Sequence, residues 1–295
     1  MICIYHSRDL DGWMSAAIVK YWFETVERPK FGGTTNIDNE LVLIGWDYGQ
    51  PIPEIVWGSD VIMVDISFPA EVMNNLFKDC KLVWIDHHIS AINEVGTVIP
   101  MSALLGVRST SFAACELTWQ YFFPQDKIPE LVRLLGRYDC FGHKNTKEEL
   151  KVLQFQYGAR ESISNYEEAV YALRTNILVQ NSWESIWKNG RAIYAYLCTE
   201  AKMIYKRAFP VTFDGFRFIT VNTDRFNPIN FGIDYHADGY DGAACFWYAN
   251  GKWTFSLYND NGQVDCSVIC KKRGGGGHKG AAGFTTKILE DVLSQ

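Results

Sequence analysis

The sequence predicts an α/β protein with a parallel-sheet N-terminal domain, flanking helices and a smaller α/β C-terminal domain. Three observations carry this prediction. Short apolar runs alternate with segments of helical apolar spacing in the N-terminal part. These runs are continuously apolar, as in a parallel sheet that is covered on both faces. Beyond residue 211 the pattern changes to short strands joined by Gly and Asn turns.

Four apolar runs in the N-terminal part predict strands, at 2–5, 41–46, 61–64 and 82–85. Segments with apolar residues three and four apart predict helices. These segments lie at 13–24, 69–79, 110–122, 128–136, 147–157, 165–178 and 183–207. Pro, Gly, Asn and Thr within 29–39 predict a loop.

The C-terminal part carries strand patterns at 216–221, 242–248 and 252–257. Asn250-Gly251 between the last two is a strong hairpin signal. A short terminal helix is expected around 285–293. We therefore expect a first domain over 1–195, a helical linker over 196–210 and a second domain over 211–295, with a cleft between the domains.

Composition narrows the class of protein. With 47% hydrophobic residues among 295, the chain can bury a substantial core, and no apolar run is long enough to predict a membrane span. Charge near the N-terminus argues against a signal peptide, and eight scattered cysteines without a CxxC pair favour reduced thiols in the cytoplasm. A formal charge of −6 argues against a broad surface for long duplex nucleic acid, but a local basic patch could hold a short anionic ligand.

Polar residues follow three of the predicted strands at the point where each strand ends. The first strand runs into His6, Asp9 and Asp11, the third ends at Asp65, and the fourth runs into Asp86-His87-His88. In open parallel sheets ligands bind beyond the carboxyl ends of the strands. We therefore expect these side chains to meet at one edge of the sheet.

This combination of side chains is typical of a metal site. Asp9 and Asp11 are two residues apart, so on an extended segment both point to one side, and such like charges are costly without a cation between them. Imidazole together with carboxylate suits manganese, zinc, iron or nickel. The plainer alternatives are an Asp-rich turn for this pair, a helix N-cap for Asp65 and a capping or solvated role for Asp139.

Together these candidates supply more ligands than one ion needs. Two ions about 3.5–4 Å apart, bridged by a shared carboxylate, can activate a water and stabilise the oxygens of a phosphoryl displacement. Asp47 and His143 are interpreted as a turn residue and an exposed loop histidine. The candidate ligands are His6, Asp9, Asp11, Asp65, His87 and Asp139.

A second cluster, 271–283, places four consecutive glycines, 274–277, between basic residues. Glycines let a backbone approach an anion closely and present N–H groups to it. The alternative is a flexible glycine turn, although the small residues at 280–283 suit the close packing of a helix start. The pattern is not a Walker loop, because no GK[ST] follows at the required spacing.

In order along the chain, these motifs resemble the DHH phosphoesterase superfamily with a C-terminal DHHA1 domain. The branch that they resemble most is that of the short oligoribonucleases (nanoRNases) and cyclic-nucleotide phosphodiesterases. The motifs are His6-x-x-Asp9-x-Asp11-Gly12, Asp65, Asp86-His87-His88, Asp139 and Gly275-Gly276-Gly277-His278-x-x-Ala281-Ala282-Gly283.

The resemblance implies a DHH domain with two manganese ions, or magnesium or cobalt as alternatives. One ion would take His6, Asp9 and Asp65, and the other would take Asp11, Asp65, His87 and Asp139. Asp86 and His88 would orient the site and contact the scissile phosphate. The DHHA1 domain would hold the substrate through Gly275, Gly276, Gly277, His278, Arg273 and Tyr258.

The implied activity is hydrolysis of short single-stranded oligonucleotides, or of linear or cyclic dinucleotides, to nucleoside monophosphates, away from any membrane. A 3′-phosphoadenosine 5′-phosphate phosphatase, a non-catalytic nucleotide-binding module and a homodimeric state are open alternatives. The glycine cluster disfavours an inorganic pyrophosphatase of DHH type. Arg137 stands where many relatives have an acid, and Tyr258 where many have an arginine, so the substrate preference is left open.

Overall fold

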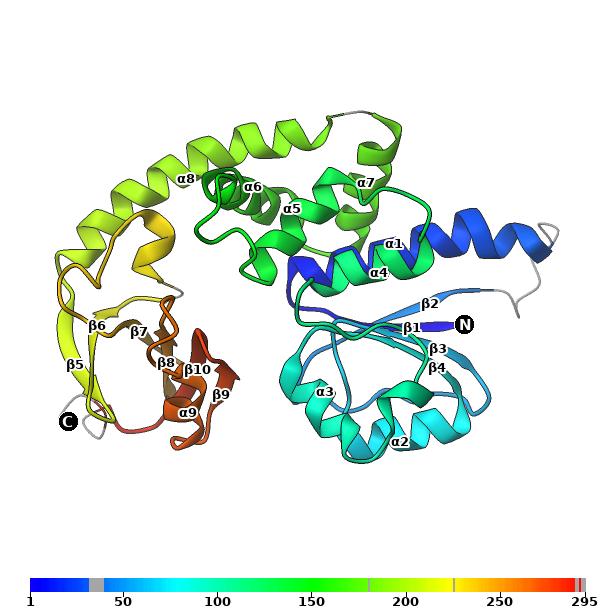
Figure 1. Cartoon of the computed structure of the whole chain (residues 1–295), viewed down its shortest axis with the longest axis horizontal. Coiled ribbons are helices and arrows are strands. Elements are labelled where there is room, and N and C mark those ends of the chain that lie inside the picture. The colour runs from blue at the N-terminus through cyan, green and yellow to red at the C-terminus, as the bar shows by residue number, and fades with distance from the viewer. Residues whose placement is uncertain (32–39, 180, 225, 290–291, 293–295) are drawn as a thin grey trace. The chain divides into compact units, whose positions relative to one another are not determined.

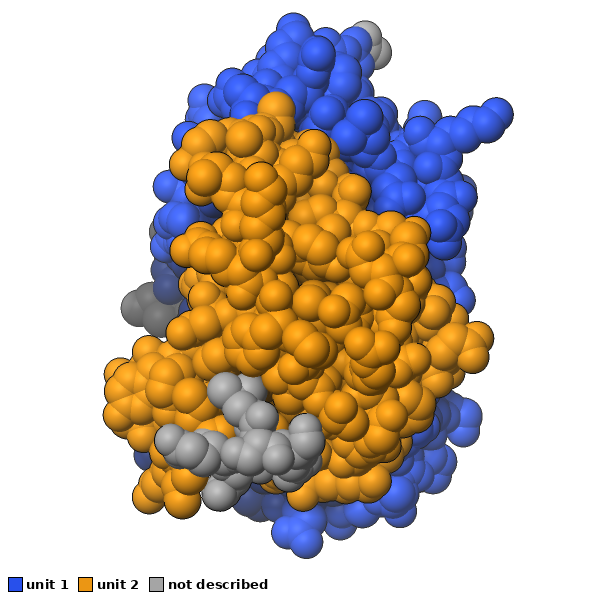
Figure 2. Space-filling view, turned by 90° about the vertical axis from the view of Figure 1, so that its left-hand side faces the viewer, with its two compact units in different colours: residues 1–193 blue, residues 194–295 orange. Residues whose placement is uncertain are grey.

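The chain folds into two compact units, residues 1–193 and 194–295, which are coloured separately in Figure 2. The computed structural model describes residues 1–31, 40–179, 181–224, 226–289 and 292. Helix α8 (Trp183–Tyr205) continues across the division between the units. Among the described residues, no helix is both long and apolar enough to cross a membrane.

Unit 1 is built on a sheet of four parallel strands in the order β2-β1-β3-β4. The strands are β1 (Ile2–His6), β2 (Val42–Trp46), β3 (Asp60–Val64) and β4 (Lys81–Ile85). The parallel sheet predicted from continuous apolar runs is confirmed.

Helices cover both faces of this sheet. Figure 1 shows α1 (Leu10–Trp22) and α4 (Ala114–Phe122) on one face and α2 (Ala70–Asp79) and α3 (Ile89–Gly96) on the other. Alternate residues of each strand face opposite sides, so the two faces have separate cores. Cys3, Tyr5, Ile62 and Val64 pack with α1 and α4, while Ile4, Val61, Met63 and Trp84 pack with α2 and α3.

The segment before α4 runs beside β4 as a short parallel continuation of the sheet. Trp84 N–H donates to the Leu105 carbonyl (3.0 Å) and Asp86 N–H to the Val107 carbonyl (3.2 Å). The Arg108 guanidinium donates to four backbone carbonyls of this region, which fixes the segment in place. The helix predicted at 110–122 begins later, at Ala114, because residues 105–108 run beside β4 and a turn over 110–112 separates them from the helix.

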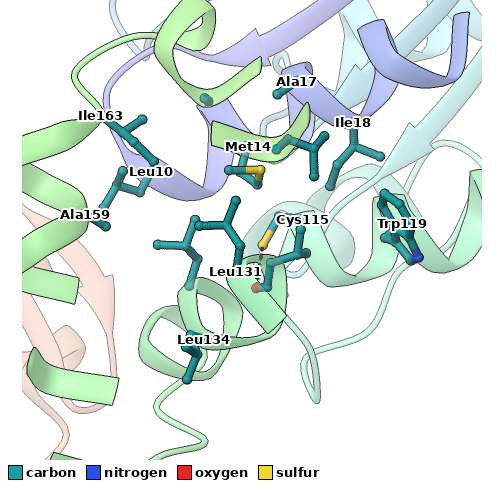
Figure 3. Close-up of a cluster of buried hydrophobic side chains, with 14 of the residues drawn as sticks. Leu10, Met14, Ala17, Ile18, Cys115, Trp119, Leu131, Leu134, Ala159 and Ile163 are labelled. Carbon is teal, nitrogen blue, oxygen red and sulfur yellow. Dashed lines mark hydrogen bonds between the residues drawn. The ribbon is translucent and has the colours of Figure 1, made fainter. Parts of the chain in front are cut away.

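The rest of unit 1 is helical and packs against the outer side of α1 and α4. It consists of α5 (Glu130–Asp139), α6 (Glu149–Ser162) and α7 (Tyr166–Leu178), followed by the first part of α8. Figure 3 shows part of their common core, which contains Met14 and Ile18 of α1 together with Leu131 and Leu134 of α5.

Helix α1 is extended by two short helical turns. A π-helical turn spans Phe23–Glu27 and a 3₁₀ turn spans Arg28–Phe31. Of the loop predicted over 29–39, the first residues are therefore helical, and 32–39 lie outside the described residues.

Unit 2 is a mixed six-stranded sheet in the order β5-β6-β7-β8-β10-β9, in which only the β6–β7 pair is parallel. Helix α9 (Cys266–Lys271) packs against this sheet. A 3₁₀ turn spans Pro228–Phe231 in unit 2, and another spans Met101–Ala103 in unit 1. The strands are β5 (Phe209–Phe213), β6 (Phe216–Asn222), β7 (Gly242–Ala249), β8 (Lys252–Tyr258), β9 (Gly276–His278) and β10 (Ala281–Thr286).

The predicted hairpin at Asn250-Gly251 is confirmed, since both residues have positive φ, 51° and 76°, as a type I′ turn requires. The helix start expected at 280–283 is wrong, because residues 281–286 form strand β10 beside β8. The terminal helix expected around 285–293 does not begin at 285, since 285–286 belong to β10 and 287–289 are not helical, whereas Val292 is helical. The strand is favoured because Phe284 is buried against Phe255, with ring centroids 5.0 Å apart. Residues 290–291 and 293–295 lie outside the described residues.

Candidate metal centre at the sheet edge

The candidate ligands of unit 1 come from separate elements that end or begin at the same edge of the parallel sheet. His6 ends β1, Asp65 follows β3, and Asp86-His87-His88 follows β4. Asp9 and Asp11 stand at the start of α1, and Asp139 ends α5. The structure thus brings together all six residues predicted as ligands, in two groups of ligand atoms that are each close enough to hold a metal ion, and a third such group joins His88 to Asp65 and His87.

The first group lies around His6. Its Nδ1 is 2.9 Å from Asp9 Oδ2 and 3.4 Å from Asp65 Oδ2. Asp9 caps α1 by accepting a hydrogen bond from Gly12 N–H, whereas Asp11 already lies within the helix. The expectation that both aspartates share one extended segment is therefore wrong, and they serve different groups.

The second group lies around His87, whose Nε2 faces three carboxylates. It is 3.2 Å from Asp139 Oδ2, 3.4 Å from Asp65 Oδ1 and 3.6 Å from Asp11 Oδ2. Asp65 therefore faces both groups, Oδ2 toward His6 and Oδ1 toward His87. This is the arrangement that a bridging carboxylate requires.

Asp65 itself is the most constrained of these residues. It is 1% exposed, it has a left-handed backbone with φ of 61°, and neither carboxylate oxygen has a hydrogen-bond partner among the described residues. Burial would raise its pKa, but the His6 and His87 imidazoles outweigh burial and hold the pKa of Asp65 well below its usual range. A buried carboxylate in this strained backbone conformation needs positive charge close to it, which bound cations would supply.

The neighbouring carboxyl groups repel one another. Burial, followed by repulsion from Asp65 and Asp139, raises the pKa of Asp11, even though the backbone N–H groups of Ala114 and Cys115 donate to its oxygens at 2.9 and 2.8 Å. Burial likewise raises the pKa of Asp139 to about 6. Such repulsion is what a divalent cation relieves.

The two imidazoles respond in the opposite direction. Burial would lower the pKa of His6, but the nearby carboxylates of Asp65 and Asp9 raise it to about 11. The pKa of His87 is raised to about 11 in the same way, against burial, by Asp65, Asp11 and Asp139. In the metal-free protein protons therefore neutralise part of the carboxylate charge, and a metal ion would replace them.

Asp86 orients the residues that follow it. Its Oδ1 accepts from the backbone N–H groups of His87 (2.7 Å) and His88 (3.0 Å), and it lies 2.8 Å from His88 Nδ1. Asp86 is fully buried, which fits the orienting half of its expected role better than a contact with substrate. His88 Nδ1 is 3.9 Å from Asp65 Oδ1, so its ring stands beside Asp65.

Sequence reasoning missed two residues near this edge, Asp47 and Tyr48, and misjudged the burial of His143. Asp47 was interpreted as a turn residue, yet its Oδ1 also lies 3.5 Å from His6 Nε2, while Arg8 donates to its Oδ2 at 3.1 Å. Desolvation and the negative charges of Asp86 and Asp65 raise the pKa of Tyr48 to about 12, although about half of the residue is exposed. His143 is buried, not exposed, with Nδ1 2.9 Å from the Arg137 carbonyl. His6 and Asp47 follow two different strands, so no spacing in the sequence marks their contact.

The glycine cluster of unit 2 is a β-hairpin, not a loop that leads into a helix. In it His278 pairs with Ala281, and Gly277 with Ala282. A Cβ at Gly275 would lie 2.1 Å from the Gly283 carbonyl oxygen, so close strand packing accounts for that glycine. Gly276 has open space around its Cα, so its backbone can be approached from outside.

The other two predicted substrate contacts of unit 2, Arg273 and Tyr258, differ in their surroundings. Arg273 donates to the Ile269 carbonyl and to Asp214 Oδ1, both at 3.0 Å, and stacks over two aromatic rings. These contacts give Arg273 a structural role that the prediction did not foresee. Tyr258 ends β8 and stands opposite Ala281 of β10, next to the hairpin that carries His278.

Comparison with known proteins supports this architecture. No family model matches the chain. An uncharacterized protein of Acanthamoeba polyphaga mimivirus, R106, is 22% identical over 99% of this chain and 69% of its own length. The structure of an exopolyphosphatase-related protein from Bacteroides fragilis covers 99% of this chain and 88% of its own, with 11% identity and a TM-score of 0.56.

A pGpG-specific phosphodiesterase, PggH, from Vibrio cholerae covers 98% of this chain and 94% of its own, with 12% identity and a TM-score of 0.47. The likeness to the Bacteroides protein is one of fold. At that level the resemblance to the DHH/DHHA1 phosphoesterases, inferred from the order of the motifs, is confirmed.

Proposed function

We propose that the protein is a metal-dependent phosphodiesterase that hydrolyses short oligonucleotides, or linear or cyclic dinucleotides, to nucleoside monophosphates. The observation that carries the proposal is the position of Asp65. Its two buried oxygens have no hydrogen-bond partner among the described residues, and each faces a separate group of histidine and aspartate side chains. This is a donor set for two divalent cations that share one carboxylate.

The residues divide between two ions, for which manganese is the first choice. His6, Asp9 and Asp65 would hold one ion, and Asp11, Asp65, His87 and Asp139 the other. When bound, the ions supply positive charge to the phosphoryl oxygens and lower the pKa of the attacking water. Asp86 fixes the His88 ring, whose imidazole would donate to an oxygen of the scissile phosphate.

Unit 2 would bind the nucleotide part of the substrate. We assign this role to the hairpin residues 275–278 and to Tyr258, because the backbone at Gly276 is open and His278 lies beside it. The small formal charge of −6 on the whole chain is compatible with short anionic substrates. Arg273 is the weakest member of this set, since its guanidinium already has protein partners.

The test is a substrate panel with product analysis. The manganese-loaded protein is incubated with linear and cyclic dinucleotides, trinucleotides, 3′-phosphoadenosine 5′-phosphate, pyrophosphate and short polyphosphate. We expect nucleoside monophosphates, without inorganic phosphate, from the dinucleotides and trinucleotides. If these are not cleaved and inorganic phosphate is released instead, together with adenosine monophosphate from the phosphoadenosine compound or with a shorter chain from polyphosphate, the protein is a phosphatase that uses the same metal centre.

His278→Ala separates substrate binding from metal binding. We expect the KM for a dinucleotide to rise about tenfold, because one imidazole contact to a nucleotide is lost, while manganese affinity is unchanged. The matched control is His236→Ala, which removes the other histidine of unit 2. A loss of manganese binding in His278→Ala would contradict the division of roles between the two units.

A further inference from the structure

A buried ion pair joins α4 to α5 just outside the carboxylate groups of the metal centre. Arg137 Nη2 of α5 lies 3.1 Å from Glu116 Oε1 and 3.0 Å from Glu116 Oε2 of α4. Glu116 is 1% exposed, so its charge is withdrawn from water and depends on this partner. Neither residue is among the candidate ligands.

Close packing fixes this pair on both helices. A Cβ at Gly136 would lie 2.4 Å from Glu116 Oε2, so α5 must present a glycine where the carboxylate rests against it. Ala113 N–H, at the start of α4, donates to the same oxygen at 3.4 Å. The Arg137 guanidinium also stacks over the Phe112 ring, 5.2 Å from its centroid. The pair therefore has little freedom to shift.

Each helix end held by this pair also holds one ligand of the second group. The N–H groups of Ala114 and Cys115, beside Glu116 on α4, donate to both oxygens of Asp11. Asp139 lies two residues after Arg137 on α5, about 200° round the helix, and so points away from the pair toward His87. The ion pair thus ties together the supports of Asp11 and Asp139.

Within the described part of the chain, no hydrogen bond or ion pair joins the first group to Glu116 or Arg137. His6 ends β1, Asp9 caps α1, and Asp47 contacts His6 from the end of β2. A change in the separation of α4 and α5 therefore acts on Asp11 and Asp139 and leaves the His6 group in place.

We propose that Glu116 and Arg137 are positioning residues that set the separation of Asp11 and Asp139, and with it the affinity for one of the two metal ions. The inference rests on the metal centre of the proposed function. It assigns control of the two ions to different parts of unit 1: the α4–α5 pair controls the ion near His87, and the strand ends control the ion near His6.

The test is a manganese titration of the metal-free protein, with unbound Mn²⁺ counted by electron paramagnetic resonance. His6→Gln and Asp139→Asn identify which binding step belongs to which group. Arg137→Met is expected to weaken the step assigned to Asp139 by about 10- to 100-fold, the range for residues that orient metal ligands, and to leave the other step within about twofold. Arg137→Lys, which keeps the charge and loses the two-pronged geometry, should fall between.

Arg133→Met is the matched control, because Arg133 lies on the same helix and pairs with Glu130 and Glu148, away from the ligands. It should lower thermal stability without changing either step. If Arg137 is lost without any effect on the two steps, or with an equal effect on both, the positioning role is overturned. If Arg137→Met fails to fold by circular dichroism, the nearly isosteric Glu116→Gln decides by the same criteria. If the wild type binds no manganese, the proposed function fails first and this inference with it.

Discussion

The described residues contain a cluster of histidine and aspartate side chains in each unit, and the two clusters differ in how many of their polar atoms have hydrogen-bond partners. In unit 2, Asp260 Oδ1 accepts from the Tyr235 hydroxyl at 2.5 Å and lies 2.9 Å from His236 Nε2, while His236 Nδ1 lies 3.0 Å from the Tyr240 carbonyl oxygen. One carboxylate is shared there by a phenol and an imidazole.

At the sheet edge of unit 1 the proportions are reversed. Among the candidate ligands four aspartates surround two imidazoles, and both oxygens of Asp65 lack hydrogen bonds among the described residues. Proximity of histidine and aspartate alone therefore does not indicate a metal site. A metal site is indicated where carboxylates outnumber imidazoles and buried carboxylate oxygens have no hydrogen-bond partner.

The largest expected effect comes from Asp65→Asn, which removes the charge that both groups share. We expect manganese-dependent hydrolysis to fall about a thousandfold or more, because several kcal/mol of charge stabilisation depend on both ions and each 1.4 kcal/mol is a factor of ten. Initial rates on a dinucleotide measure this. Asp126→Asn, at an exposed turn, is the control. Near-normal activity of Asp65→Asn would show that the two clusters are of the same structural kind.

Proton release on manganese binding is the second test that distinguishes the cluster of unit 1 from that of unit 2. The pKa of His6 and that of His87 are raised to about 11 in the metal-free protein, whereas metal ligation needs neutral imidazoles. At pH 8, manganese binding should therefore release about one proton per imidazole, and the affinity should rise by up to about tenfold per pH unit for each proton released.

Calorimetry in buffers of different ionisation enthalpy counts these protons, and His6→Gln should remove about one of them. The same pKa shifts determine how the stability of the metal-free protein depends on pH. Since folded imidazoles with raised pKa values stabilise the fold fully below pH 6.5, that stability should fall as the pH rises from 6.5 toward 11. A melting temperature that rises over this interval would contradict the assigned charges.

How much of this site could be predicted depended on whether the signal was local. His6, Asp65 and His87 follow apolar strands, and the carboxyl ends of parallel strands share an edge, so their convergence followed from the strand pattern alone. Asp139 was found through the order of the motifs, since its place after a helix carries no strand signal.

The residues that escaped prediction have tertiary partners far away in the sequence. Glu116 and Arg137 are 21 residues apart on different helices, and Asp47 reaches His6 from the neighbouring strand, so no spacing marks either contact. In unit 2, β10 was mistaken for helix because Gly and Ala at 281–283 carry no periodicity. Its pairing with β8 and the burial of Phe284 decide the conformation.

A smaller effect is expected from the unit 2 cluster. Asp260→Asn weakens the hydrogen bonds from Tyr235 and His236 to a carboxylate, which should destabilise the fold by about 1–3 kcal/mol. Thermal unfolding measures the loss, and Asp234→Asn, a neighbouring aspartate that caps only a local turn, is the control. Manganese affinity should not change. A weakened metal step in Asp260→Asn would mean that this cluster also takes part in ion binding.

The smallest effect is expected from Asp47, which contacts a candidate ligand of the first ion without being one itself. Asp47 Oδ1 lies 3.5 Å from His6 Nε2, a longer contact than the 2.8 Å between Asp86 and His88, and Arg8 offsets part of its charge. Asp47→Asn should therefore weaken the manganese step assigned to His6 by only about tenfold, the low end for a carboxylate that orients a ligating histidine. The step assigned to Asp139 should be unchanged, measured by the same resonance titration. An equal loss in both steps would show that the carboxylates act as one electrostatic unit, because orientation by Asp47 can act only through the histidine that it touches.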